Sequence, residues 1–136
     1  MRRYVPILAA ASLALAAPLV GASSASAFGG ETLGCSVNPG GYGSGQSSCG
    51  TSVPASSYSV GYNVQGGSGS YTYSWTVHGG TITAGCTSTT DYCAINAIEI
   101  ANDRYLTASV VITQGSSQAT LSATAYIPAG CGNYLC

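Results

Sequence analysis

Positive charge is almost absent from this sequence. The chain contains no lysine, and its three basic residues are Arg2, Arg3 and Arg104. Beyond residue 27, one arginine stands against four carboxylates, so the side chains there sum to −3. Phosphate backbones and anionic membrane surfaces attract clusters of lysine and arginine. The composition therefore excludes nucleic acid as a partner and disfavours an anionic membrane surface.

Catalytic and metal-binding side chains are also scarce. His78 is the single histidine, and no G-x-S-x-G or C-x-x-C motif is present. A hydrolase triad needs a base beside its nucleophile, but His78 falls at a turn after a strand-like segment. Glu99, Asn102 and Asp103 offer oxygen ligands suited to calcium, yet they lack the regular spacing of a calcium loop. An ordinary turn explains Asn102 and Asp103 equally well, so we expect no catalytic residue, no metal site and no cofactor.

Long apolar runs are confined to the N-terminus. Arg2 and Arg3 precede an apolar run of about 16 residues, and small residues then end in an A-x-A pattern at residues 25–27. A membrane-spanning helix needs about 20 such residues, whereas this arrangement is typical of a cleaved secretory signal peptide. We therefore predict that residues 1–27 are a signal peptide, that the mature chain begins at Phe28, and that it has no membrane span. Cys35 lies too far beyond the apolar run for a lipoprotein signal.

Six cysteines follow the predicted leader. An even number of cysteines in a small exported chain indicates disulfide bonds. Because only a short loop separates Cys86 from Cys93, we predict a disulfide bond between these two cysteines first. Two further local pairs, Cys35–Cys49 and Cys131–Cys136, or a bridge from the N-terminal segment to the C-terminal tail, remain open. The cysteines are Cys35, Cys49, Cys86, Cys93, Cys131 and Cys136.

Glycine divides the mature chain into two parts. Residues 28–50 hold many glycines, which add backbone freedom and little apolar surface, so we expect a loop-rich arm held by its two cysteines. From residue 57 onward, apolar and polar residues alternate as in half-buried strands. The alternating stretches are 58–64, 71–77, 81–83, 94–100, 105–113 and 117–127.

The last two stretches indicate a hairpin. Residues 114–116 supply a glycine-containing turn between them, and Pro128 ends the second strand. The spacing of the isoleucines in the stretch 94–100 suits a helical turn at one point and a strand at another, and we favour a strand there. Short alternating strands with frequent turn signals predict one all-β domain, an antiparallel sandwich over residues 51–128. A cysteine-bearing tail at 129–136 follows it.

One region carries a family likeness. The run SYTYSWTV at residues 70–77, followed by GGTIT at 79–83, resembles the core of PKD-like immunoglobulin-fold modules in bacterial secreted proteins. Residues 105–113 and the strand after them look like the paired final strands of those modules. The chain departs from the pattern at 78–80, where PKD modules usually carry an Asp-Gly turn. The resemblance, over residues 57–127, implies an immunoglobulin-like fold and a role in extracellular contact without catalysis.

Tyrosine is the side chain most suggestive of binding. It combines a flat apolar ring with a hydroxyl group, so it serves at protein contacts and can stack on sugars. The rings at 71, 73 and 75 share one face of one predicted strand, and we expect most of them in the core. Tyr42, Tyr92 and Tyr134 lie in segments bounded by cysteines. These three tyrosines are the candidate binding residues.

The sequence thus predicts a secreted, non-catalytic binding or structural module at the extracellular or cell-surface side. Its expected partner is an extracellular protein or a cell-wall polysaccharide. One alternative is a protease inhibitor that inserts Thr89 or Tyr92 from the disulfide loop at 86–93, since preorganised loops bind at a lower entropic cost. Another is a self-assembling surface protein, because strands with so little charge protect their edges poorly.

Secretion and oxidation can be tested together by intact-mass spectrometry of the exported protein. We expect an N-terminus at Phe28 and a mass lower by six hydrogen atoms than that of the reduced chain, because all six cysteines would be paired. Alkylation before reduction should label no thiol. An exported chain that retains Met1, or that carries six alkylated cysteines, would contradict the prediction.

Overall fold

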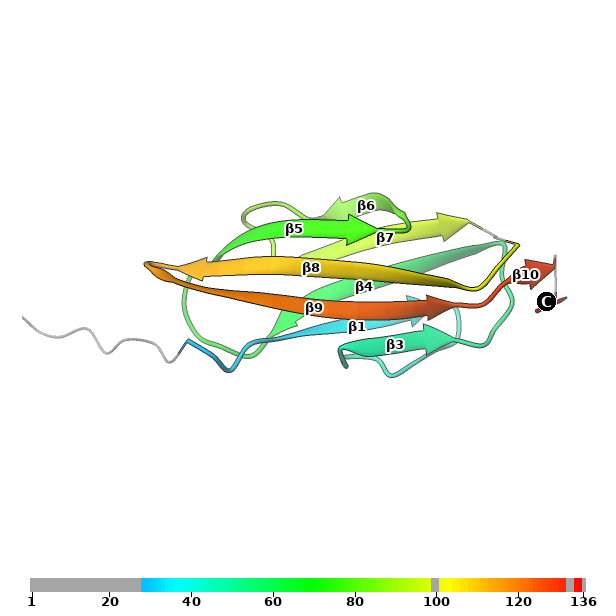
Figure 1. Cartoon of the computed structure of the whole chain (residues 1–136), viewed down its shortest axis with the longest axis horizontal. Coiled ribbons are helices and arrows are strands. Elements are labelled where there is room, and N and C mark those ends of the chain that lie inside the picture. Colours follow the sequence, from blue (N-terminus) through cyan, green and yellow to red (C-terminus); the bar gives the residue numbers. More distant parts are fainter. Residues whose placement is uncertain (1–27, 99–100, 132–133, 136) are drawn as a thin grey trace, which may run out of the picture.

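The computed structural model describes residues 28–98, 101–131 and 134–135, and their regular structure is entirely β-strand. They form two main sheets and a short third one (Figure 1). None of these residues builds a helix that could span a membrane. The predicted signal peptide and Glu99 lie outside the described residues. The expectation of an all-β chain is confirmed.

The first sheet has four strands in the order β1-β4-β7-β6, and all of its pairings are antiparallel. Its central strand β4 matches the alternating stretch predicted at 58–64. The pairing of β6 with β7 shifts register between Ile82 and Ala84. The strands are β1 (Thr32–Asn38), β4 (Ser57–Gln65), β6 (Thr81–Gly85) and β7 (Tyr92–Ile98).

The second sheet has five strands in the order β2-β3-β9-β8-β5. The predicted hairpin is present as β8 and β9, where Gly115 takes a φ of 59° in the two-residue turn, as glycine readily does. Unlike the other pairings, β3 runs parallel to β9, so the expectation of a wholly antiparallel sandwich is wrong at this point (Figure 1). The strands are β2 (Gly41–Tyr42), β3 (Ser48–Thr51), β5 (Thr72–His78), β8 (Arg104–Gln114) and β9 (Ser117–Ile127).

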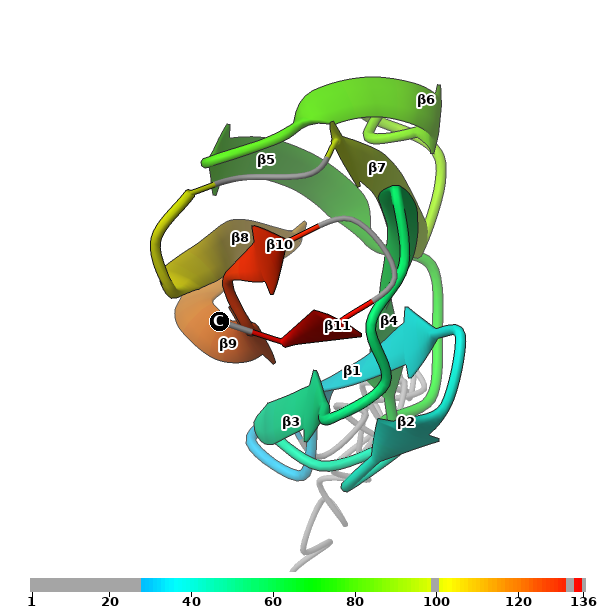
Figure 2. The same cartoon turned by 90° about the vertical axis from the view of Figure 1, so that its right-hand side faces the viewer.

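The hydrophobic core lies between these two sheets. Figure 2 shows β8 and β9 on the left and β4 and β7 on the right of the space that the core side chains fill. Strand alternation turns every second side chain inward. The largest fully buried side chains include Tyr58 and Tyr62 of β4 and Leu106 and Ile112 of β8. Tyr62 spans the core and donates a hydrogen bond of 2.8 Å to the Leu106 carbonyl, and burial raises the pKa of Tyr62.

The aromatic run of β5 is less buried than the sequence suggested. Tyr73, Trp75 and Val77 are half-buried and pack against the core from one face of β5. They stay partly exposed because β5 is the edge strand of its sheet. The fully buried aromatic rings come instead from Tyr58 and Tyr62, on an inner strand of the other sheet.

The glycine-rich segment 28–50 is not the loop-rich arm that we expected. It contributes β1 to the first sheet and β2 and most of β3 to the second. Leu33, Cys35 and Val37 alternate inward on β1, a short pattern that the flanking glycines hid. Glycine also has a packing reason at position 41, where a Cβ atom would overlap the Val37 carbonyl oxygen.

Two predicted disulfide bonds are present. Cys35–Cys49 joins β1 of the first sheet to β3 of the second, and Cys86–Cys93 closes a short loop between β6 and β7. Because both cysteines of the N-terminal segment pair with each other, the alternative bridge from that segment to the tail is wrong. The tail forms the short strands β10 (Gly130–Cys131) and β11 (Tyr134–Leu135), and Figure 1 places β10 beyond the end of β9. Cys136 lies outside the described residues.

Glu31 is the buried carboxylate of the described residues, with an exposed fraction of 7%. Its two oxygens accept hydrogen bonds from the Tyr71 hydroxyl group at 2.7 Å and from the Gly29 amide at 2.8 Å. These bonds, that of Tyr71 first, lower the pKa of Glu31, and the bond to Glu31 raises the pKa of Tyr71. The carboxylate thus ties the first described residues to the start of β5.

Glu31 should make the fold sensitive to acid. Because its pKa in the folded state lies below the ordinary value of 4.5, the unfolded chain takes up a proton first as the pH falls, and the free energy of unfolding decreases below that pH. Denaturant unfolding between pH 6 and pH 3 would measure this decrease. Glu31→Gln should reduce it, whereas Asp91→Asn, at an exposed position, should retain it. Equal acid responses for Glu31→Gln and the unmodified chain would contradict the prediction.

Candidate functional site

A shallow groove crosses the outer face of the first sheet beside Tyr92. The register aligns Ser36 of β1, Gly61 of β4 and Ala94 of β7 in one row. Residues aligned in this way project from the same face of a sheet. These small side chains form the floor of the groove, and Tyr92, with 43% of its surface exposed, stands at one side.

The groove is uncharged and polar. It has a volume of about 290 Å³, and its lining includes no acidic, basic or histidine side chain. The lining residues with polar side chains at the surface are Ser36, Ser44, Asn63 and Gln65. Within the described part of the chain, none of these four side chains has a hydrogen-bond partner, so their hydroxyl and amide groups are available to a ligand.

The Tyr92 ring is held in place by a glycine. Gly85 of β6 pairs with Cys93, next to Tyr92. A Cβ atom at Gly85 would lie 2.7 Å from two carbon atoms of the Tyr92 ring, and Gly85 has a φ of 68°. The ring therefore lies against the backbone of β6. A side chain that is already positioned loses less conformational freedom when a ligand binds.

The three candidate tyrosines do not form one site. Tyr42 is 54% exposed, but it lies on β2 of the second sheet, whereas Tyr92 belongs to the first sheet. Tyr134 belongs to β11, and its side chain lies outside the description. Tyr42 and Tyr92 thus mark two separate surfaces.

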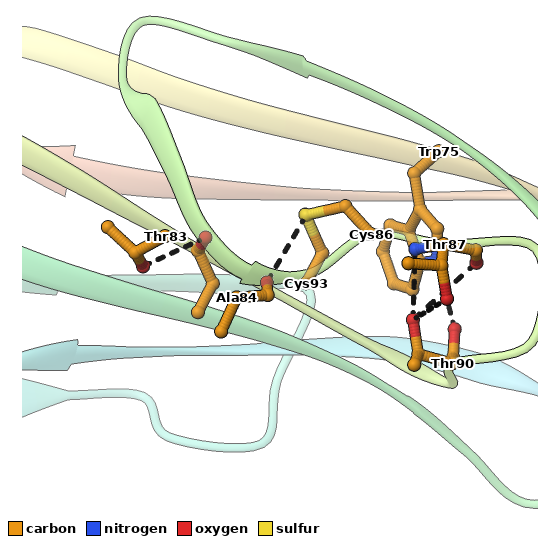
Figure 3. The surroundings of a disulfide bond; sticks show 8 residues. Trp75, Thr83, Ala84, Cys86, Thr87, Thr90 and Cys93 are labelled. Atoms are coloured by element: carbon orange, nitrogen blue, oxygen red, sulfur yellow. Dashed lines mark hydrogen bonds between the residues drawn. A yellow bond between two sulfur atoms is a disulfide. The ribbon is translucent and has the colours of Figure 1, made fainter.

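The disulfide loop at 86–93 packs along the edge strand β5 (Figure 3). The Trp75 indole donates a hydrogen bond of 3.0 Å to the Thr90 carbonyl, and the Tyr73 amide donates one of 3.1 Å to the Ser88 carbonyl. Within the loop, the Thr87 amide and hydroxyl group both lie 3.0 Å from the Thr90 hydroxyl oxygen. An inhibitory loop has to enter a protease cleft, whereas this loop uses its carbonyl groups to cover β5. The geometry favours an edge cover.

The other candidate residues are not gathered into a reactive centre. The Asp103 carboxylate accepts hydrogen bonds of 2.9 Å from the Ala129 amide and from the Tyr126 hydroxyl group, and these bonds lower its pKa. His78 is exposed at the end of β5. Across the described ranges, no three His, Cys, Asp or Glu residues lie close enough together to hold a metal ion.

No family model, curated protein or solved structure matches this chain. The function therefore has to be inferred from the surfaces themselves. Sequence patterns had indicated Tyr92 but had missed Asn63, Gln65 and Gly61. Strand alternation over 58–64 places Gly61 and Asn63 on the polar face of β4, yet only the pairing with β1 and β7 brings them beside Tyr92.

Trp75 offers a direct test of the edge cover, because it is the single tryptophan of the chain. In the double variant Cys86→Ala/Cys93→Ala we expect tryptophan emission at longer wavelength and stronger acrylamide quenching, since the loop is released and the indole becomes hydrated. Alanine suits position 93, where the side chain is fully buried. Ser88→Ala should change neither signal, because Ser88 acts through its backbone carbonyl. A folded double variant with unchanged emission and quenching would show that the disulfide does not hold the loop on β5.

Proposed function

We propose that this chain is a secreted, non-catalytic binding module with an immunoglobulin-like sandwich of the PKD-like kind. The strand order supports the fold. In immunoglobulin-type sandwiches, strands A, B, E and D form one sheet, and C, F and G form the other. When the strands are lettered in chain order, β1, β4, β7 and β6 of the first sheet correspond to A, B, E and D. In the second sheet, β5, β8 and β9 correspond to C, F and G. Trp75 then lies on the C strand, where antibody domains also carry a tryptophan.

The groove beside Tyr92 is the observation that carries the binding role. It combines one positioned aromatic ring, unpaired hydroxyl and amide groups, and a floor of small residues. Binding sites typically combine apolar surface with a few polar groups that fix orientation. The volume of about 290 Å³ suits one polar, uncharged unit, such as a sugar residue or a neutral side chain of an extracellular protein. The two internal disulfides agree with an oxidising, extracellular setting.

Self-assembly through strand edges has less support. The disulfide loop covers part of the β5 edge. The edge strand β6 is short and irregular, because its register shifts between Ile82 and Ala84. Both features interrupt the pairing of one sheet edge with another.

The binding role can be tested with immobilised cell-wall polysaccharides and extracellular matrix proteins. We expect the chain to be retained by at least one of them, and Tyr92→Ala to weaken that binding by about tenfold, which is about 1.4 kcal/mol. Gly61→Val should weaken it as well, because the new side chain fills the groove floor, while valine suits a strand. The control Ser59→Ala lies on the outer face of the same strand but outside the groove. The proposal fails if no material retains the chain, or if Tyr92→Ala and Gly61→Val both bind as the unmodified chain does.

A further inference from the structure

The outer face of the second sheet carries a row of three tyrosines that extends across four neighbouring strands. The register aligns Tyr42 of β2 with Gly50 of β3, Gly50 with Tyr126 of β9, and Tyr126 with Tyr105 of β8. Aligned residues share a face, and the neighbours Cys49, Ala125 and Leu106 point into the core. Figure 1 looks onto this sheet, with β5, β8, β9 and β3 following one another from top to bottom. At a strand spacing of ~4.8 Å the row is about 14 Å long.

Two rings of this row are exposed, the third, Tyr126, is half-buried, and the row is already positioned. Tyr105 is 66% exposed and Tyr42 is 54% exposed. The ring centres of Tyr105 and Tyr126 lie 5.5 Å apart, and the Tyr126 hydroxyl group is fixed by its hydrogen bond to Asp103. A Cβ atom at Gly50 would lie 2.7 Å from the Tyr42 hydroxyl oxygen, so the glycine lets Tyr42 lie against the sheet beside Tyr126.

Short hydroxyl side chains cover the adjoining part of the same face. They come from β3, β9, β8 and β5, and the register places them in rows next to the tyrosines. Their hydroxyl groups have no hydrogen-bond partner among the described residues, so they present donors and acceptors to solvent. They include Ser48, Thr124, Thr107, Thr76, Ser109 and Ser122.

Few charged side chains lie near this face, and Asp103 and Arg104 among them are hydrogen-bonded to neighbouring groups. Asp103 is bound by Tyr126 and Ala129, and Arg104 donates a hydrogen bond of 3.3 Å to the Gly79 carbonyl. His78 ends the row that contains Thr107. A face with so few charged side chains favours an uncharged partner, since a charged partner would lose hydration and gain little opposite charge in return.

The size of the tyrosine row distinguishes between two kinds of uncharged partner. Without the neighbouring serines and threonines, three fully covered rings contribute roughly 450–750 Å², so the rings alone fall below the roughly 800 Å² per partner of a stable protein–protein interface. A row of flat rings next to a hydroxyl-covered surface instead fits a chain of sugars, whose rings present apolar faces and whose edges carry hydroxyl groups. We propose that this face is a second binding site, separate from the Tyr92 groove, and that it binds a neutral polysaccharide. Tyr42, Tyr126 and Tyr105 stack on successive sugars, and the serines and threonines bond to sugar hydroxyl groups.

Retention on insoluble cellulose and chitin, and on a soluble neutral glucan by affinity electrophoresis, tests this site. We expect at least one of these polysaccharides to bind the full mature chain, with an affinity that salt changes little, because no ion pairs form. The double variant Tyr42→Ala/Tyr105→Ala should bind about tenfold more weakly, which is about 1.4 kcal/mol. Tyr105→Trp should retain binding because it keeps a flat ring. Thr107→Val/Thr124→Val should weaken binding, since valine preserves shape and removes the hydroxyl groups. Circular dichroism establishes that each variant is folded.

The control is Ser59→Ala, on the outer face of the opposite sheet and outside the Tyr92 groove, which should bind these polysaccharides as the unmodified chain does. The inference is overturned if none of the three polysaccharides binds the chain, or if folded Tyr42→Ala/Tyr105→Ala binds as the unmodified chain does. It is also overturned if only protein matrices retain the chain. Binding that Tyr92→Ala abolishes and the double variant keeps would place the polysaccharide in the groove, which overturns this site and supports the proposed function. Binding that the double variant abolishes and Tyr92→Ala keeps would support this site and leave the groove without a ligand.

Discussion

The covalent link between the two sheets is the constraint on which the rest of this structure depends. Cys35 and Cys49 are each 2% exposed and join β1 of one sheet to β3 of the other. A bridge of this loop length stabilises a fold by about 3 kcal/mol, a large share for a small domain with a modest core. Because β3 also pairs with β9, the same bond connects the beginning of the described chain to its last long strand.

The two sheets are joined through the core, and the surface of the chain protects its sheet edges with almost no charged side chains. Natural sheets commonly protect their edges with lysine, which this sequence lacks. Here the second disulfide holds a loop of hydroxyl residues against the edge strand β5, and Trp75 and Tyr73 provide the hydrogen-bond donors. The outer sheet faces can then carry serine, threonine, asparagine and tyrosine. A surface of this composition suits neutral, hydroxyl-bearing partners better than ionic ones.

The sequence predicted those parts of the fold that depend on local patterns. Alternation located β4 to β9, and loop length identified Cys86–Cys93, because both signals lie within a few residues. The strands β1 and β3 escaped notice because glycines interrupt them and because their pairing partners lie far away in sequence. The tyrosine row was missed for the same reason. Tyr42, Tyr105 and Tyr126 are separated by tens of residues, and only the register of four strands aligns them.

The many glycines and the many tyrosines of this chain belong to one structural arrangement. Glycine weakens a strand, since it has no side chain to pack and restricts the unfolded chain least. At Gly50 and Gly85 the ring of a nearby tyrosine, Tyr42 or Tyr92, occupies the space that a Cβ atom would fill. Each ring thereby covers backbone that would otherwise be hydrated, and it is ordered before any ligand arrives. The glycines of β3 and β6 thus help to preorganise the two exposed surfaces.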